Sequence, residues 1–393
     1  MSTQFTDQLI IGVIGAGSMG AGIAQVASQA GHKVYLTDSY PDALERAAKG
    51  HQKIFNRLVE KGRMTFDEAN ACAKRITYTQ KLDDLKRCGL VIEAIIEDLD
   101  IKQGLFQELE MICDDEAILA SNTSTLPIVA IGGKLQNPSR VIGIHFFNPA
   151  PLMALVEVIP SMLTRDGLAD EMKNLMKAWG KVPVIAKDTP GFIVNRVARP
   201  FYGESIRILE EGIADEATID WALKEIGGFR MGPFELMDLI GNDINFAVTS
   251  TAFKSFFYDG RYRPSVIQQR LVEGGMLGRK SGRGYYDYSE GAEKPEPNTS
   301  RALGELIVNR VLCLLINSAI DALHFGVASK EDLDLAMTKG VNYPKGLLAW
   351  GDERGLDNVL NRIDSLYDDY REDRYRACVL LRRMVKEGKN FYS

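Results

Sequence analysis

The sequence predicts a doubly wound α/β domain with a mostly parallel sheet and a helical-hairpin insertion, followed by an all-α C-terminal domain in two copies. Three observations support this prediction. Strand-like runs alternate with helical segments over the first half of the chain. The pattern becomes almost wholly helical after Pro190, and that helical part contains an internal repeat. A chain of 393 residues is long enough for two or three domains.

The first strand, turn and helix follow one another within 31 residues. Residues 9–14 (LIIGVI) form a short apolar run of the kind expected for a buried parallel strand. A glycine-rich turn follows, and a helix runs from about Met19 to Gln29 and ends at Gly31. Residues 34–37 are the second strand, and Asp38 stands at its end.

The rest of the α/β domain continues this alternation. Residues 41–75 are polar with helical spacing and an interruption at residues 61–63, which predicts a helical hairpin inserted after the second strand. Further strand-like runs lie at residues 90–96, 117–120, 141–147 and 155–159, with another candidate at 182–186. Helical segments separate most of them, so we expect a doubly wound sheet.

The helical part repeats itself at an offset of 114 residues. The segment IVNRV at 193–197 recurs at 307–311, and the same offset pairs several glycines and aspartates without an insertion. The second copy stops before any counterpart of the LGRKSGRGYYDY segment that ends at Tyr288. We therefore expect an α/β domain at 1–188, a first helical copy at 189–288, a polar linker at 289–301 and a truncated second copy at 302–393.

Composition narrows the class of protein. A formal net charge of −6 argues against a general nucleic-acid binder and against a protein held on an anionic membrane. The five cysteines are scattered and form no Cys-x-x-Cys motif, so we expect reduced thiols, no metal site and a cytoplasmic protein. The N-terminal sequence MSTQFTDQLIIGVIG lacks the pattern of a signal peptide, and no uninterrupted apolar stretch is long enough to span a membrane.

The glycine-rich turn predicts a dinucleotide site. Residues 15–20 (GAGSMG) fit G-x-G-x-x-G, in which Gly15 permits the turn, Gly17 lets the backbone approach a pyrophosphate and Gly20 lets the helix pack on the strand. Glycines often only make turns, but this motif follows a strand, opens a helix and precedes an acid. Asp38 would accept hydrogen bonds from the adenosine ribose, and no arginine adjoins it, so NAD is favoured over NADP and a Rossmann domain is expected.

His145 and Glu157 are the candidate catalytic pair. His145 ends an apolar strand, whereas the sequence places His32 on the surface, His51 on the hairpin and His324 on a helix of the second copy. A histidine beside phenylalanines is more often a packed structural residue. Glu157, however, lies within the apolar run LVEVI, where a carboxylate is costly unless it is paired. If the chain folds back at residues 149–151, Glu157 reaches His145 and fixes its tautomer.

Several motifs in this order resemble the L-3-hydroxyacyl-CoA dehydrogenase family: GVIGAGSMGAGIA, VIEAIIEDLDIKQGLF, ILASNTSTL, GIHFFNPAPLMALVEVI and DTPGFIVNRV. The similarity runs from about residue 9 to 288, and the second helical copy resembles a further C-terminal domain of the family. The resemblance implies NAD-dependent oxidation of a 3-hydroxyacyl-CoA in fatty acid metabolism, such as β-oxidation, with the substrate held in a cleft between a Rossmann domain and a helical domain.

The resemblance also implies roles for individual residues. His145 corresponds to the catalytic base and Glu157 to its partner, while Ser124 and Asn195 hold the reacting oxygen and the thioester carbonyl. Other matched positions surround the cofactor: Ser18, Met19, Glu97, Lys102, Asn122, Asn148 and Lys280. Simpler interpretations exist for some of them. Ser124 could cap a helix, Glu97 and Lys102 could form a surface pair, Asn195 could be structural, and Lys280 could lie in a solvated loop.

A basic stripe on the hairpin is the candidate CoA-binding surface. Lys49, Lys53, Arg57 and Lys61 recur every four residues, and Lys53 is the member of the stripe that we expect to contact the CoA phosphates. Spacing alone slightly favours a solvated basic face, but the resemblance implies that the hairpin contacts the acyl-CoA, which favours the CoA-binding interpretation for the stripe as a whole. Ala154 stands where many members of the family carry a lysine, which weakens the transfer of substrate detail.

Assembly and substrate remain open at this point. The duplicated helical domain leaves two expectations, either a homodimer or two copies that pack as a pseudo-dimer within one chain. The alternatives to the leading function are an NAD-dependent dehydrogenase of a free hydroxy acid and an NAD-binding relative without activity. The length and identity of the acyl chain, including hydroxybutyryl and hydroxyadipyl groups, also stay open.

Overall fold

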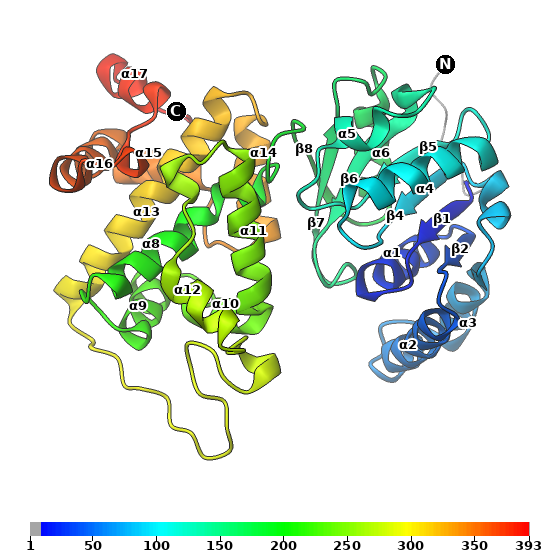
Figure 1. Cartoon of the computed structure of the whole chain (residues 1–393), viewed down its shortest axis with the longest axis horizontal. Coiled ribbons are helices and arrows are strands. Elements are labelled where there is room, and N and C mark those ends of the chain that lie inside the picture. Colours follow the sequence, from blue (N-terminus) through cyan, green and yellow to red (C-terminus); the bar gives the residue numbers. More distant parts are fainter. Residues whose placement is uncertain (1–8, 393) are drawn as a thin grey trace. The chain divides into compact units, whose positions relative to one another are not determined.

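The computed structural model describes residues 9–392, so the part of the signal-peptide prediction that rests on residues 1–8 lies outside the described residues. The chain divides into two compact units, Met1–Thr189 and Pro190–Ser393. Figure 1 shows strands and helices in the first unit and helices in the second.

The first unit is built on an eight-stranded sheet with the order β3-β2-β1-β4-β5-β6-β7-β8. All neighbouring strands pair in parallel except β6 and β7, which are antiparallel. This confirms the predicted doubly wound, mostly parallel sheet. The strands are β1 (Ile11–Ile14), β2 (Val34–Thr37), β3 (Ile76–Thr79), β4 (Leu90–Glu93), β5 (Ile118–Ser121), β6 (Val141–Phe146), β7 (Leu155–Pro160) and β8 (Val182–Ile185).

The central strands β1, β4, β5 and β6 are buried at every position, because helices cover both faces of this sheet. The predicted hairpin is present as α2 and α3, and Thr65 and Glu68 form a capping box at the start of α3. The helices are α1 (Ser18–Gln29), α2 (Pro41–Glu60), α3 (Phe66–Arg75), α4 (Leu99–Ile112), α5 (Ile128–Gly132) and α6 (Leu168–Ala178), with short η1 (Leu82–Arg87) and η2 (Pro138–Arg140).

The second unit is helical, and its elements repeat with the register of the sequence repeat. α10 (Pro233–Ile240) and α15 (Leu347–Arg354) begin and end 114 residues apart. The first copy also contains α7 (Val194–Val197), α8 (Arg199–Glu210), α9 (Glu216–Trp221), η3 (Ala222–Ile226), α11 (Asn242–Ser255), η4 (Gly260–Tyr262), α12 (Val266–Glu273) and η5 (Arg279–Ser281). The second contains α13 (Arg301–His324), α14 (Lys330–Gly340), α16 (Leu356–Tyr370), η6 (Asp373–Tyr375) and α17 (Val379–Glu387).

The long helix α13 forms the core of the helical unit. It fuses into one helix the counterparts of α7 and α8, and by length and composition alone it could cross a membrane. However, 83% of its most apolar stretch is buried inside the protein. Its apolar character is therefore explained by packing against the neighbouring helices.

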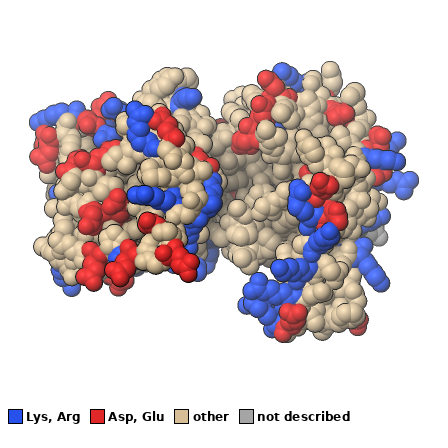
Figure 2. Space-filling model, turned by 60° about the horizontal axis from the view of Figure 1, so that its bottom comes forward, with Lys and Arg blue, Asp and Glu red and all other residues tan. Residues whose placement is uncertain are grey.

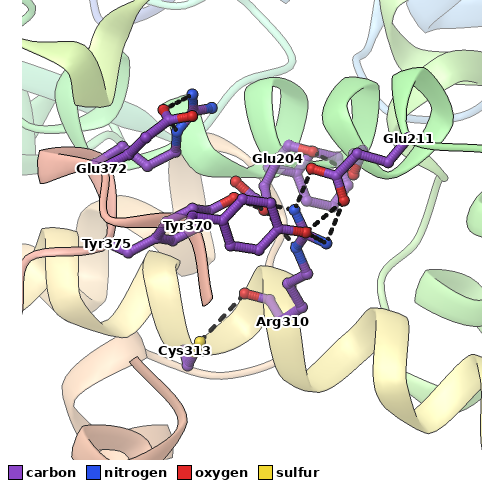
Figure 3. Close-up of polar contacts among 10 residues, drawn as sticks. Glu204, Glu211, Arg310, Cys313, Tyr370, Glu372 and Tyr375 are labelled. Carbon is purple, nitrogen blue, oxygen red and sulfur yellow. Dashed lines mark hydrogen bonds and ion pairs between the residues drawn. The ribbon is translucent and has the colours of Figure 1, made fainter. Parts of the chain in front are cut away.

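Ion pairs made by equivalent arginines join the two helical copies. Arg196 of the first copy donates to Asp321 on α13 at 3.1 Å, and its repeat counterpart Arg310 donates to Glu204 on α8 at 2.5 Å. Figure 3 shows Arg310 enclosed by Glu204, Glu211, Tyr370 and Tyr375. Each copy thus supplies the same arginine to the other, but the acceptors are not equivalent, because Asp321 corresponds to Arg207 of the first copy and Glu204 to Ser318 of the second.

Candidate active site

The glycine-rich turn has the geometry that its motif requires. Gly15 has a φ of +96°, and a Cβ on Gly20 would lie 1.7 Å from the carbonyl oxygen of Gly15. A side chain at either position would therefore disrupt the contact between β1 and α1. A Cβ on Gly17 would meet nothing within 4 Å, so the backbone is open to a ligand at that residue. Ser18 and Met19 begin α1, whose first N–H groups face the same turn.

Asp38 lies directly beside this turn, at the end of β2. Its Oδ2 accepts a hydrogen bond from the Ala16 N–H at 2.7 Å, and its Oδ1 accepts one from the Tyr40 N–H at 2.9 Å. Each carboxylate oxygen keeps a further lone pair for a hydroxyl donor. The glycine cradle, the free helix N-terminus and this carboxylate together fit the pyrophosphate and ribose of NAD.

His145 and Glu157 form a buried hydrogen-bonded pair. The antiparallel register of β6 and β7 places the two residues directly opposite each other, and His145 Nδ1 lies 2.7 Å from Glu157 Oε2. His145 is 6% exposed and Glu157 is fully buried. The chain reverses after β6 through a cis Asn148–Pro149 peptide, at the place where the sequence predicted a reversal. Because Glu157 engages Nδ1, the ring can exchange a proton through Nε2.

Glu97 organises the loop that carries Ser124. Its Oε1 accepts hydrogen bonds from the Thr123 and Thr125 hydroxyls and from the backbone N–H of Ser124. Burial favours a raised pKa for Glu97, but these hydrogen bonds and the nearby Lys102 outweigh it and lower the pKa, so the carboxylate stays charged. Ser124 is no helix cap, since α5 begins four residues later, and its hydroxyl donates to no described residue.

Lys102 is a buried residue, which excludes the surface-pair interpretation. It is 1% exposed and forms ion pairs with Glu93, which is fully buried, and with Glu97 at 3.4 Å. Glu93 also accepts from the Ser121 hydroxyl at 2.7 Å and the Ile95 N–H at 2.7 Å. Sequence reasoning missed Glu93, although a carboxylate inside the apolar run LVIEAII is the same signal that identified Glu157.

Asn122 and Asn148 connect these elements. Asn122 follows β5, and its Oδ1 accepts from the Phe146 N–H at 2.8 Å, next to His145. Asn148 Oδ1 lies 3.4 Å from the Ser18 hydroxyl at the start of α1. The first unit thus gathers the glycine turn, the Ser124 loop and the strand end of His145 at the carboxyl ends of parallel strands, where ligands bind in such sheets.

Two predicted residues belong to the helical unit. Asn195 is half-buried on the short helix α7. Lys280 is 44% exposed and forms an ion pair with Asp243 at 2.6 Å, which favours a structural surface role for it. Their assignment to the catalytic and cofactor sites stays a prediction.

A pocket of about 800 Å³ opens between the glycine turn and the hairpin. Four basic residues line it: Arg46, Arg57, Lys61 and Arg63. Lys53, the predicted phosphate contact, is exposed but does not line the pocket, and Lys49 is exposed and paired with Glu45. Figure 2 shows basic side chains gathered over this hairpin.

Two histidines outside the catalytic pair, His32 and His51, are buried in the structure. The sequence placed His32 on the surface, which is wrong: it is 5% exposed, and its Nδ1 lies 3.0 Å from the Leu9 carbonyl. His51 is also buried on α2, between the Tyr78 hydroxyl and the Ala21 carbonyl, each at 2.8 Å. Burial lowers the pKa of His51, which keeps it neutral beside the basic pocket.

Comparison with known protein families matches both units of the chain to domains of one family. A family model described as "3-hydroxyacyl-CoA dehydrogenase, NAD binding domain" matches residues 10–189. A second, described as "3-hydroxyacyl-CoA dehydrogenase, C-terminal domain", matches twice, at residues 191–288 and 306–391.

Individual relatives agree with these matches. The chain is 38% identical to a 3-hydroxyadipyl-CoA dehydrogenase of Escherichia coli (strain K12), over 95% of this chain and 96% of that protein. It is 38% identical to a 3-hydroxybutyryl-CoA dehydrogenase of Clostridioides difficile over 71% of this chain and 99% of that protein. The crystal structure of a 3-hydroxybutyryl-CoA dehydrogenase from Escherichia coli K12 superimposes with a TM-score of 0.92 at 37% identity, covering 97% of this chain and 98% of that one.

Proposed function

Because the chain belongs to the 3-hydroxyacyl-CoA dehydrogenase family and is an NAD-dependent oxidoreductase of 3-hydroxyacyl-CoA, we propose that His145 is its general base and Glu157 the partner of that base. The observation that carries this proposal is the buried 2.7 Å contact between His145 Nδ1 and Glu157 Oε2. A histidine fixed in this way exchanges protons through its other ring nitrogen.

Each residue of the site has a distinct part in the reaction. NAD, when bound, supplies the hydride acceptor, and the glycine turn with Asp38 would hold it. His145 accepts the proton of the substrate 3-hydroxyl at Nε2, and the Glu157 carboxylate stabilises the imidazolium that forms. Such base assistance contributes about 10²–10⁴-fold in rate. Ser124 has its hydroxyl available for the reacting oxygen, and the hydrogen bonds of Glu97 hold its loop in place. Asn195 is assigned to the substrate by resemblance.

The test of this assignment is a His145→Ala variant. NADH-linked turnover with acetoacetyl-CoA is expected to be nearly abolished, while NADH binding, followed by fluorescence, stays close to wild type. Turnover that remains at the wild-type level would refute the role of His145. Running the same assay with acetoacetate and with 3-ketoadipyl-CoA separates a free hydroxy acid substrate from a thioester and compares the two candidate acyl groups.

We propose that the basic pocket beside α2 holds the nucleotide part of CoA. Arg46, Arg57, Lys61 and Arg63 supply positive charge for phosphates along a pocket that also includes Gly17. Arg57→Gln is expected to raise the KM for acetoacetyl-CoA several-fold more than the KM for acetoacetyl-pantetheine, which lacks the nucleotide. Lys53→Gln is the matched control on the same helix, and an equal effect of the two variants would contradict this location.

Two further properties are proposed from the described residues. The ion pairs that the equivalent residues Arg196 and Arg310 make with the other copy support a pseudo-dimer within one chain, and chromatography with light scattering should then give the 43.6 kDa mass of one chain. A mass of twice this value would favour the homodimer. The five cysteines are buried free thiols, which supports a cytoplasmic protein.

A further inference from the structure

The second helical copy contains a pocket that the reaction does not use. Its volume is about 470 Å³, within the range of small-molecule sites. It lies between α13 and the pair formed by α15 and α16. Its apolar walls include Leu306, Leu312, Ile316 and Val359. Its polar residues are Asn309, Asn358, Arg354 and Arg362.

This pocket occupies the face that corresponds to the Asn195 face of the first copy. Subtracting the repeat offset of 114 residues takes Asn309 to Asn195. The same subtraction takes Arg354 to Ile240 and Arg362 to Val248. The second copy therefore has the same asparagine and carries two positive charges at positions where the first copy is apolar.

Neither of these arginines is neutralised. Among the described residues, no carboxylate lies within ion-pair distance of Arg354 or Arg362. Arg354 Nη1 donates to Asn309 Oδ1 at 2.5 Å, which leaves its charge uncompensated. Arg362 Nε is enclosed and donates to no described residue. Its Nη groups also have no acceptor among the described residues, so an anion in the pocket can bind to Arg362 through them.

Three of the neighbouring carboxylates are already engaged. Glu353 pairs with Lys345, and Asp364 accepts from Arg382 at 2.5 Å. Asp352 accepts from the backbone N–H groups of Phe391 and Tyr392 near the C-terminus. These three carboxylates could neutralise the pocket only by breaking one of these contacts, whereas Asp357 is exposed to solvent.

We propose that this pocket binds a medium-chain aliphatic carboxylate. The apolar walls take the hydrocarbon chain, and Arg362, with Arg354, takes the carboxylate through charge-assisted hydrogen bonds. The site lies wholly within the second copy, so its occupancy does not depend on the assignment of His145 or on the proposed CoA pocket.

Calorimetric titration of the full chain with octanoate tests this site. The titration is done with saturating NAD and acetoacetyl-CoA, the oxidised cofactor and the ketone, so that the substrate site is occupied and no turnover occurs. Saturable binding with one site per chain is expected. Acetate, which has the head without the chain, and 1-octanol, which has the chain without the charge, should each bind at least tenfold more weakly.

Two variants locate the binding. Arg362→Gln should weaken octanoate binding at least tenfold, whereas Arg383→Gln, an exposed arginine of the same copy, should leave it unchanged. Leu306→Trp adds bulk at the partly exposed rim and should also weaken binding. Thermal unfolding and NADH-linked turnover, both expected to be unchanged, show that the variants fold.

Three results would overturn the proposal. The first is the absence of octanoate binding by the wild-type chain. The second is binding that persists in both Arg362→Gln and Leu306→Trp. The third is equal binding of octanoate and acetate, which would show that the apolar walls contribute nothing.

Discussion

Replacing Glu157 by glutamine tests the charge of the buried pair while keeping its shape. Glu157 is fully buried, and its Oε2 lies 2.7 Å from His145 Nδ1. The glutamine side chain can still accept a hydrogen bond from Nδ1, so the ring orientation is kept and only the negative charge is lost. A hydrogen bond to a charged group is worth about 1.5–3 kcal/mol and a neutral one about 0.5–1.5 kcal/mol, so losing the charge costs about 1–1.5 kcal/mol. At about 1.36 kcal/mol per tenfold change, this corresponds to a decrease in kcat of roughly 5–13-fold.

The assay is steady-state oxidation of 3-hydroxybutyryl-CoA followed by NADH absorbance, with NADH affinity measured separately. The affinity should change less than twofold, because Asp38 and the glycine turn are untouched. Glu116→Gln is the control, since Glu116 is exposed and precedes the amino end of β5, whereas His145 lies near the carboxyl end of the neighbouring parallel strand β6. A Glu157→Gln variant whose kcat stays within twofold of the wild-type value would refute the argument that this charge stabilises the imidazolium.

Three further changes have distinct expected results. Gly17→Ala should leave the melting temperature within about 2 °C but weaken NADH binding at least tenfold in a fluorescence titration, because a Cβ there meets no protein atom but enters the space of the cofactor. Arg310→Met leaves Glu204 buried without its partner and should cost about 3–5 kcal/mol in a urea unfolding curve. Burial raises the pKa of Asp220 to about 7, so the folded chain holds a proton that the unfolded chain loses above about pH 4. Its contribution to stability therefore declines as the pH rises from about 4 to 7, and Asp220→Asn should lack this slope in unfolding curves measured across that range.

The sequence predicted the elements whose signal is local. The strands β1 and β2 could be predicted because a buried parallel strand is largely apolar. Asp38 could then be identified as the acid that directly follows β2. The strand β3 was missed. Its sequence, ITYT, contains only one aliphatic residue, and it becomes a strand by pairing with β2 at the edge of the sheet. Pairing of this kind depends on tertiary contacts and leaves little trace in composition.

The basic surface shows how helical geometry limits a spacing argument. Residues four apart on a helix are rotated by about 40°, since each residue turns about 100°. The stripe from Lys49 to Lys61 therefore sweeps through about 120° and does not stay on one face. Only the C-terminal half of the stripe, Arg57 and Lys61, lines the pocket. Arg46, about three helical turns before Arg57, lines it as well. Arg63, beyond the end of α2, could be placed only by the fold.

Of two buried carboxylates in the sheet, the sequence analysis identified Glu157 and overlooked Glu93. Glu157 was identified because a carboxylate in an apolar run needs a partner, and the paired strands supply His145. Glu93 carries the same signal, but its partner Lys102 lies on the helix that follows. The pairing is set by the packing of α4 on β4, so the sequence could have indicated that Glu93 needs a partner without indicating which one.

The joining of the two helical copies in one chain changes how their contact responds to dilution. Two separate subunits hold together by mass action, and their interface opens when their concentration falls below its dissociation constant. Here the two halves are linked through residues 289–300, so each meets the other at an effective concentration that dilution does not alter. The salt bridges of Arg196 and Arg310 are thus maintained at the nanomolar enzyme concentrations of a kinetic assay.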